Sequence, residues 1–289
     1  MPQTINTNLQ SLNAQRNLNS SQSSLSVAMQ RLSSGLRVNS AKDDAAGLAI
    51  ATRMDTQVRG SSVAIRNAND GISLAQVADG ALSKVTDSLQ RMRELAVQAR
   101  NATNTSADRV SLDQEFGELA KEIQRVLGGT TFNGKRILGA DAMTQTFQVG
   151  ANTSTNDRIE LGTTNMAANS TITLVSGVGN TGVGRSAIGG ATVTGSMIDS
   201  VINNIDLALT TITDQRAVLG AAQNRFDAVI ANLQVAVENQ SAAKSRIMDA
   251  DFAAETAALS RAQILQQAGT AMVAQANQLP QQVLSLLQR

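Results

Sequence analysis

The stretch at residues 40–100 constrains the fold most strongly, because its apolar residues recur in alternating steps of three and four. In its second half these positions are Leu82, Val85, Leu89, Met92, Ala96 and Ala99. This spacing is typical of a coiled-coil seam rather than of the broader stripe on a globular surface helix. An unbroken helix of this length would extend for roughly 85–90 Å at about 1.5 Å per residue. It therefore requires long partner helices elsewhere in the chain.

Local signals predict where the helices begin and end. Ser40-Ala-Lys-Asp43 has the form of a capping box, which predicts the start of the long helix. A second helix is predicted to open at Ser106 and to stop at the glycine pair 128–129. Its apolar stripe is Leu112, Phe116, Leu119, Ile123 and Val126. We expect this second helix to fold back antiparallel on the end of the first.

The strongest heptad run in the chain follows Ser196. Its apolar positions are Ile198, Ile202, Ile205, Leu209, Ile212, Leu219, Phe226, Ile230, Leu233 and Val237. Arg216 and Gln223 occupy two seam positions, where polar side chains usually determine register and partner. The run matches the second half of the first long helix in length, so the two are expected to pair. Residues 244–251 are polar and charged and are predicted to form a joint.

Thinner seams with few charges lie at both ends of the chain. The amino-terminal seam is Leu9, Leu12, Leu25, Met29 and Leu32, and the carboxyl-terminal seam is Met272, Ala276, Leu279, Val283 and Leu286. Isolated helices with such thin seams are marginal in water. The two ends are therefore expected to pair with each other.

The middle of the chain, from about residue 130 to 195, is rich in Gly, Thr, Ser and Asn. Phe147 and Val149 alternate with polar residues, as do Ile159 and Leu161, which predicts a β-hairpin. Residues 171–175 and 191–194 are expected to be further short strands. The Gly-x-Gly spacings between residues 177 and 184 have no strand, turn and helix around them and no Lys, so we do not interpret them as a phosphate loop.

The predicted fold is therefore mainly α, a long antiparallel coiled-coil bundle of N- and C-terminal segments with a small β-hairpin-rich middle insertion. Residues 1–43 are expected to form a terminal helix and connector, and residues 44–162 the first part of an inner domain. Residues 163–195 are a short surface insertion. Residues 196–249 return as the second long helix, and residues 250–289 form the other terminal helix.

Composition excludes several function classes. The chain has no Cys and no His, which removes thiolate catalysis, disulfides and the commonest general base and metal ligand. We accordingly expect no catalytic, cofactor-binding or metal-binding residues. The net charge of +1 leaves no electrostatic footprint for nucleic acid or an anionic membrane. No apolar run of about 18 residues could span a membrane, and the amino end lacks a secretory signal pattern. Taken alone, these features predict a cytoplasmic protein.

Two other interpretations follow from the residues. A site made of carboxylates alone, at Asp157 and Glu160, would be catalytic, but exposed acids in a hairpin are usually solvated. A coiled-coil signalling module, such as a chemoreceptor rod, would need a sensor or membrane element, which the sequence lacks.

Several long motifs closely resemble the bacterial flagellins. They begin with Leu-Ser-Ser-Gly-Leu-Arg-Val-Asn-Ser-Ala-Lys-Asp-Asp-Ala-Ala-Gly-Leu-Ala-Ile at residues 32–50 and continue at residues 89–98, 131–134, 262–269 and 274–287. The resemblance covers both ends, roughly residues 1–139 and 197–289, and leaves the middle unmatched.

The resemblance implies a structural subunit, not an enzyme, that self-assembles into the flagellar filament for swimming. Its paired terminal seams would form the inner tube. Flagellins are exported unfolded through the hollow flagellum by a type III apparatus, which replaces the cytoplasmic expectation with a secreted, extracellular one. The implied partners are other copies of the chain, an export chaperone, and the cap and hook-junction proteins.

The resemblance also implies an animal receptor. In flagellins of several bacterial classes the matching residues contact Toll-like receptor 5, and those positions are Gln90, Arg91, Leu95 and Glu115 here. Read without the resemblance, the charged residues are a solvated helix surface. We expect Leu95 to be an exposed apolar residue between charges, which would suit an interface.

Alternatives within the resemblance stay open. A hook–filament junction protein shares the terminal design, although the match at residues 262–287 favours the filament subunit. A zinc peptidase in the insertion would need H-E-x-x-H, and the chain has no His. Residues 163–195 are too short for the sizeable outer domains of many flagellins, so a small β-rich cap or a flexible loop is expected there.

Overall fold

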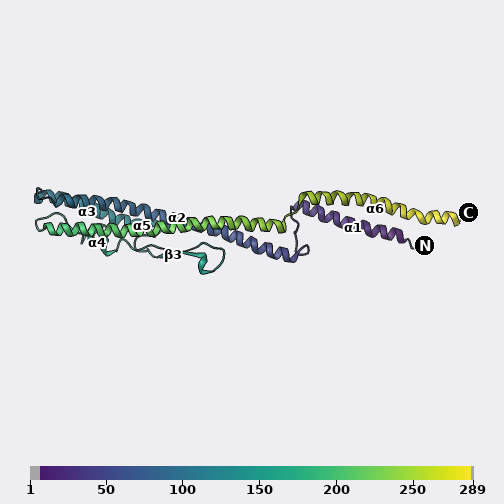
Figure 1. Ribbon diagram of the computed structural model, residues 1–289, viewed down its shortest axis with the longest axis horizontal. Helices are drawn as coiled ribbons and strands as arrows, with labels where there is room; N and C mark the ends of the chain where they lie inside the picture. The colour runs from purple at the N-terminus through teal and green to yellow at the C-terminus, as the bar shows by residue number, and fades with distance from the viewer. Residues whose placement is uncertain (1–6, 288–289) are drawn as a thin grey trace. The chain divides into compact units, whose positions relative to one another are not determined.

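The computed structural model describes residues 7–287, with the side chains of residues 279–287 left out of the description. It divides into two compact units, each considered by itself. The first comprises Met1–Val58 and Glu238–Arg289, and the second comprises Arg59–Val237. Helices dominate both units, as predicted, and two small antiparallel strand pairs complete the second (Figure 1). None of the described helices is long and apolar enough to cross a membrane.

The predicted long helix is confirmed as α2, Ala45–Ala99. Its start differs from the expectation. Asp43 does reach back to the backbone N–H of Ser40, at 2.8 Å, but residues 41–43 form a turn. The helix instead begins after Asp44, whose Oδ1 accepts a hydrogen bond from the Gly47 N–H at 2.8 Å. The cap lies four residues later than predicted because Asp43 is used to close the preceding turn.

Helix α2 pairs with α5, Gly195–Met248, in the second unit. Three ion pairs join them: Arg100–Asp199 at 2.8 Å, Arg93–Asp206 at 2.7 Å and Arg216–Asp79 at 2.7 Å. The residue numbers of the partners increase along α2 as they decrease along α5, so the two helices are antiparallel, as expected. These pairs are largely exposed and each adds only about 0.2–1 kcal/mol. Their main effect is to select register, and Arg216 does so from a predicted seam position.

The buried face of α5 repeats with a strict heptad. Its buried residues are Ile198, Val201, Ile205, Ala208, Ile212, Gln215, Leu219, Ala222 and Phe226. Five of these were predicted, at intervals of seven. The expected alternates Ile202 and Leu209 are only partly buried, and their neighbours Val201 and Ala208 face the core instead. These smaller residues allow the helices to approach closely. A prediction that considers only large apolar residues does not identify such positions.

Helix α3, Ser106–Gly129, has the predicted bounds and folds back beside α2. Thr105 and Asp108 form its capping box. Phe116 and Ile123 are fully buried, as their stripe predicted, in one core with residues of α2 and α5. Arg91 of α2 meets Glu115 of α3 at 2.9 Å, which shows that the two helices lie side by side.

The strands form two hairpins. The first joins β1, Thr131–Phe132, to β2, Lys135–Arg136, through Asn133 and Gly134, which both have positive φ. The second is the predicted hairpin, in which β3, Thr144–Gln148, pairs with β4, Arg158–Gly162, after the short 3-10 turn η1, Thr155–Asp157. Phe147 lies opposite Ile159.

Phe226 anchors this hairpin to the two long helices. Its ring meets the Phe147 ring edge-on, with centroids 5.5 Å apart. A Cβ at Gly71 of α2 would lie 2.7 Å from the Phe226 ring, so only glycine leaves room for it. Gln215 of α5 also donates to the carbonyl of Gly162 at 3.1 Å.

The insertion differs from the expectation. Residues 171–175 are not a strand but lie in helix α4, Ser170–Ser176, and residues 191–194 are not a strand either. The Asn169 side chain caps α4 by accepting from the Thr171 N–H at 3.0 Å. A helix also places Ile172 and Val175 together in the core, which overrides the β-propensity of the segment. The insertion, which also contains η2, Gly179–Thr181, is thus neither a β-rich cap nor a loop without packing.

The first unit contains α1, Leu9–Ser34, and α6, Phe252–Leu287. The joint before α6 is shorter than predicted, because α5 continues through Lys244 to Met248. A bridge between Leu36 and Asp249 closes the connector, and Arg37 donates to the carbonyl of Ile247 at 2.7 Å.

Candidate functional site

The pairing of α1 with α6 begins with well-defined helix ends. The Asn8 side chain accepts from the Ser11 N–H at 3.1 Å at the start of α1, and Gly35, with a φ of 71°, ends that helix. Asp251 Oδ1 accepts from the Ala253 N–H at 2.9 Å at the start of α6. Local capping therefore defines both ends of α1 and the start of α6.

Three contacts show that α1 and α6 run antiparallel: Arg31–Glu255 at 3.0 Å, Ser11 Oγ to Asn277 Oδ1 at 2.7 Å and Asn8 Nδ2 to the Ala276 carbonyl at 2.7 Å. The expectation that the chain ends meet is confirmed for the described residues. The buried residues of this pair are small: Ser11 and Ala28 on α1, and Ala262 and Ala276 on α6.

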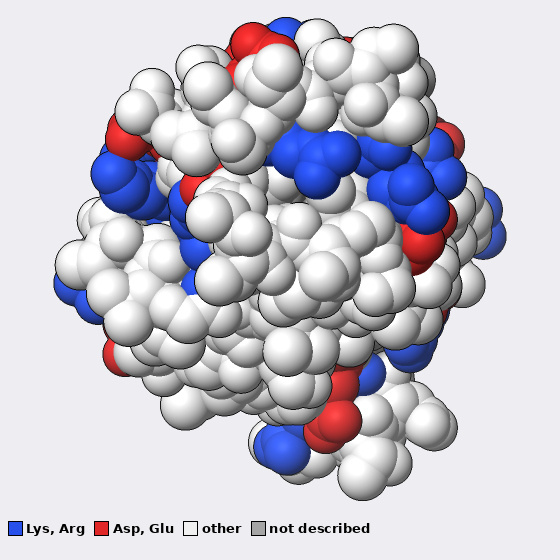
Figure 2. Space-filling view, turned by 90° about the vertical axis from the view of Figure 1, so that its left-hand side faces the viewer, with Lys and Arg blue, Asp and Glu red and all other residues white. Residues whose placement is uncertain are grey.

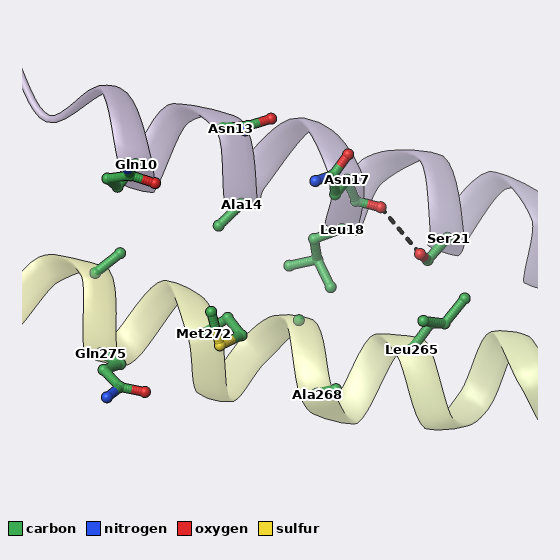
Figure 3. A pocket seen from close by; sticks show the side chains of 12 residues that line it. Gln10, Asn13, Ala14, Asn17, Leu18, Ser21, Leu265, Ala268, Met272 and Gln275 are labelled. Carbon is green, nitrogen blue, oxygen red and sulfur yellow. Dashed lines mark hydrogen bonds between the residues drawn. The ribbon is translucent and has the colours of Figure 1, made fainter.

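A groove of about 530 Å³ lies between the two helices. Leu18 points toward α6, while Leu265 and Met272 point toward α1 (Figure 3). A Cβ at Gly269 would lie 3.1 Å from Leu18 Cδ1, so this glycine makes space for Leu18. The remaining lining residues are Gln10, Asn13, Ala14, Asn17, Ser21, Ala268, Gln275 and Ala276, so none of the walls is charged.

Large apolar side chains remain exposed around this pair. They are Leu9, Leu12, Val27 and Met29 on α1, and Phe252, Ile264, Leu265 and Met272 on α6. Leu9 is 68% exposed and Met272 is 58% exposed. Because soluble monomers seldom expose this much apolar surface on one element pair, the arrangement is typical of a binding surface.

The predicted seam residues are distributed between the inside and the outside of the pair. Ala276 is buried, and Leu25 and Leu32 are partly buried. Leu9, Leu12, Met29 and Met272 are exposed. The side chains of Leu279, Val283 and Leu286 lie outside the described residues.

Sequence reasoning missed the groove residues Leu18, Leu265 and Gly269. The available signal was Gly269 itself. Glycine in a helix interior is destabilising relative to Ala, so an isolated one often indicates close approach of another element.

The second predicted site lies where α2 and α3 meet. Arg91 Nε donates to Glu115 Oε1 at 2.9 Å, and Arg91 Nη1 donates to Glu94 Oε2 at 2.9 Å. The Glu115 hydrogen bond, with that of Glu94, raises the pKa of Arg91 further above its usual value. Gln90 is exposed beside them. Three of the four predicted receptor residues therefore do lie at the surface.

Leu95 corrects the expectation of an exposed anchor, because it is only 1% exposed and belongs to the core. The prediction assumed one seam on α2, leading through Leu89 and Met92. In the structure Leu95 belongs to one core with residues of both α3 and α5, so the buried face of α2 is wider than a single seam. Leu95 can therefore contribute to a surface contact only indirectly, by packing under the exposed residues.

The structure describes the acidic side chains of residues 7–278. No group of three or more acidic side chains there could hold a metal ion. Asp157 Oδ2 accepts from the Ser154 N–H at 3.2 Å, which assigns this carboxylate to capping a turn. At the end of the second unit, basic and acidic side chains surround a largely uncharged centre (Figure 2).

The fold and these surfaces define a structural protein of long paired helices. Two family profiles match it: the bacterial flagellin N-terminal helical region at residues 5–144 and the C-terminal helical region at residues 202–287. A flagellin of Halalkalibacterium halodurans is 45% identical over 283 residues, covering 98% of this chain and 99% of that one. A flagellin of Xenorhabdus nematophila is 43% identical over 312 residues, covering 99% of this chain and 100% of that one.

This chain belongs to the flagellin family and is a structural subunit of the flagellar filament, which is extracellular. A solved flagellar hook-associated protein from Vibrio parahaemolyticus has a TM-score of 0.59 at 12% identity, covering 72% of this chain and 100% of that one. That likeness concerns the fold alone, and the flagellin relatives favour the filament subunit over the junction protein.

Proposed function

We propose that this chain is exported unfolded by a type III apparatus and polymerises with copies of itself, using the α1/α6 pair as its principal contact between subunits. By resemblance to flagellins, an export chaperone and the cap and hook-junction proteins assist it before and during assembly. The predicted terminal seams form the inner tube.

One observation carries the assembly proposal: the α1/α6 pair combines an uncharged groove with a set of exposed large apolar residues. The residues buried within the pair are mostly small, so much of the apolar surface of both helices remains for another subunit. Burial of that surface is worth about 25 cal/mol per Å², and the same contact recurs in every subunit.

Met272→Glu tests this contact. Met272 lines the groove but is 58% exposed, so the change should leave the monomer folded. In the polymer the new carboxylate would be buried without a partner. We expect the concentration needed for filament growth, measured by light scattering and electron microscopy, to rise roughly tenfold or more, as about 1.4 kcal/mol of lost binding implies.

Met143→Glu is the matched control, because Met143 is 61% exposed and belongs to the second unit, whereas Met272 belongs to the first. It should polymerise nearly as the unmodified chain does. Equal filament growth by the Met272 variant and the unmodified chain would contradict the proposed contact.

We further propose that the free monomer is recognised by Toll-like receptor 5 through Gln90, Arg91 and Glu115, with Leu95 supporting them from the core. The resemblance to receptor-binding flagellins motivates the assignment. Arg91 is held by two carboxylates, which orients its guanidinium at the surface. Arginine so placed is a common anchor in protein interfaces.

Arg91→Asp should reduce receptor signalling by the soluble monomer at least about tenfold, since an interface hot spot contributes about 2 kcal/mol or more. The same face is proposed to pack against a neighbouring subunit, so filament formation should also fall. Reporter-cell signalling and electron microscopy measure the two effects. Lys84→Asp is the control, because Lys84 is an exposed α2 residue outside the proposed set. Full signalling by the Arg91 variant would refute the receptor assignment, and normal filaments would refute the packing assignment.

A further inference from the structure

The last residue of α4 and the segment that follows it lie along one face of α3, and we call residues 176–190 the strap. As the strap advances in sequence, its partners on α3 have lower and lower residue numbers. Ser176 and Gly177 contact Gln124, and Gly182 lies near Lys121. Arg185 then contacts Asp113, and Gly189 lies against the carbonyl of Arg109. The strap therefore runs antiparallel to α3.

Asp113 is one of three attachments at the far end of the strap. Ser186 donates to the Leu174 carbonyl through its N–H at 3.0 Å and its Oγ at 2.6 Å, and Ile188 is fully buried. Asp113 Oδ1 accepts from Arg185 Nη1 at 2.9 Å and from the Ile188 N–H at 2.9 Å. Asp113 Oδ2 accepts from Arg185 Nη2 at 2.6 Å. The guanidinium also lies 5.7 Å from the centre of the Phe116 ring. Such a bidentate, charge-assisted contact is among the stronger polar contacts available to a side chain.

The environment keeps this carboxylate ionised. Burial by itself raises the pKa of Asp113, but the Arg185 guanidinium and the backbone N–H groups of Ile188 and Gly189 outweigh it, and the pKa lies below its usual value. Two glycines give the contact room. A Cβ at Gly117 would lie 3.2 Å from Arg185 Nη2, and one at Gly189 would lie 2.2 Å from the Arg109 carbonyl oxygen.

The near end of the strap is held separately, and the part between is closed by a small bridge in which the Val178 N–H donates to the Val183 carbonyl at 3.0 Å. Gln124 is buried and donates to Ser176 Oγ at 2.8 Å and to the Gly177 carbonyl at 2.9 Å. Between the two attachments, Val178 and Val183 are exposed. Segments with few buried apolar contacts open at a lower free energy than the core around them.

We infer that the Asp113–Arg185 contact is a clasp that closes the strap on α3, and that the strap opens locally around Arg185 while Ile188 and the surrounding helices remain packed in the core. Opening releases Arg185 from Phe116 and uncovers the outer face of α3 around Gly117. The clasp is independent of the proposed assembly contact.

Trypsin provides the test, because Arg185 is itself a cleavage site within the strap. In the full-length monomer its side chain is held by Asp113, so the Arg185–Ser186 bond should be cut slowly. Asp113→Asn should raise the rate of cleavage at that bond at least about tenfold, measured by mass spectrometry, since cleavage follows the population of the open form when reclosing is fast. Arg185→Lys keeps the charge and the cleavage site but loses the bidentate geometry, and should give an intermediate increase.

Glu122→Gln is the matched control, because it removes an exposed ion pair with Arg125 on the same helix and does not touch the strap. Its Arg185–Ser186 bond should be cut at the original rate. An unchanged rate in both clasp variants would refute the clasp. A parallel rise at Arg93 and Arg100 on α2 would show opening of the whole unit, and would overturn the inference of a separately moving strap.

Discussion

Removal of residues 274–289 is expected to abolish filament formation and leave the second unit folded. The deletion takes away Ala276, whose carbonyl accepts from Asn8, and Asn277, whose side chain accepts from Ser11. It also removes Gln275 from the wall of the groove. The α1/α6 pair then loses one end of its contact in every subunit, and each loss is repeated along the polymer.

Electron microscopy of polymerisation reactions measures the first part of this prediction, and thermal unfolding followed by circular dichroism measures the second. The truncated chain should produce no filaments at concentrations where the full chain polymerises completely, while the main unfolding transition stays in place. Filaments of normal yield would contradict the assembly role of the α1/α6 pair. Disappearance of the main transition would show that the second unit depends on this segment, contrary to the prediction.

Phe226→Ala is expected to destabilise the chain by about 3–5 kcal/mol, the range for removal of a buried phenylalanine ring. Phe226 is fully buried between Gly71 of α2 and Phe147 of the β3–β4 hairpin. The chain has only five Phe and no Trp or Tyr, so no other ring replaces this contact. Because Gly71 leaves space for the ring, the substitution creates a cavity that its neighbours cannot readily fill. Urea unfolding followed by circular dichroism measures the change.

Phe252→Ala supplies the control for this prediction. It is the same chemical change at a side chain that is 56% exposed, and we expect it to alter the free energy of unfolding by less than about 0.5 kcal/mol. Similar effects from both substitutions would mean that the Phe226 contact is not a principal attachment between the hairpin and the helices.

The insertion and Leu95 show where sequence reasoning stopped. Residues 171–175, Thr-Ile-Thr-Leu-Val, are mostly β-branched, so the local propensity favours a strand. The fold instead provides a cap at Asn169 and an apolar core that accepts Ile172 and Val175 from one helical turn. Leu95 has charged neighbours in sequence, yet it is buried in the core. The local pattern is insufficient in both cases, because burial in the core depends on residues distant in sequence.

The periodicity of apolar residues by itself determined the long helices and the β3–β4 hairpin, since a period of 3.5 is typical of packed helices and a period of 2 is typical of strands. The order of these segments along the chain predicted the antiparallel pairing. The motifs at both ends determined the family. Only the tertiary structure decided which of two adjacent seam positions faces inward, as with Val201 in place of Ile202. It also decided that Gly269 opens a groove beside Leu18. The physical reason is that a period specifies the face of a helix, whereas burial depends on how many neighbours pack on that face and how closely they approach.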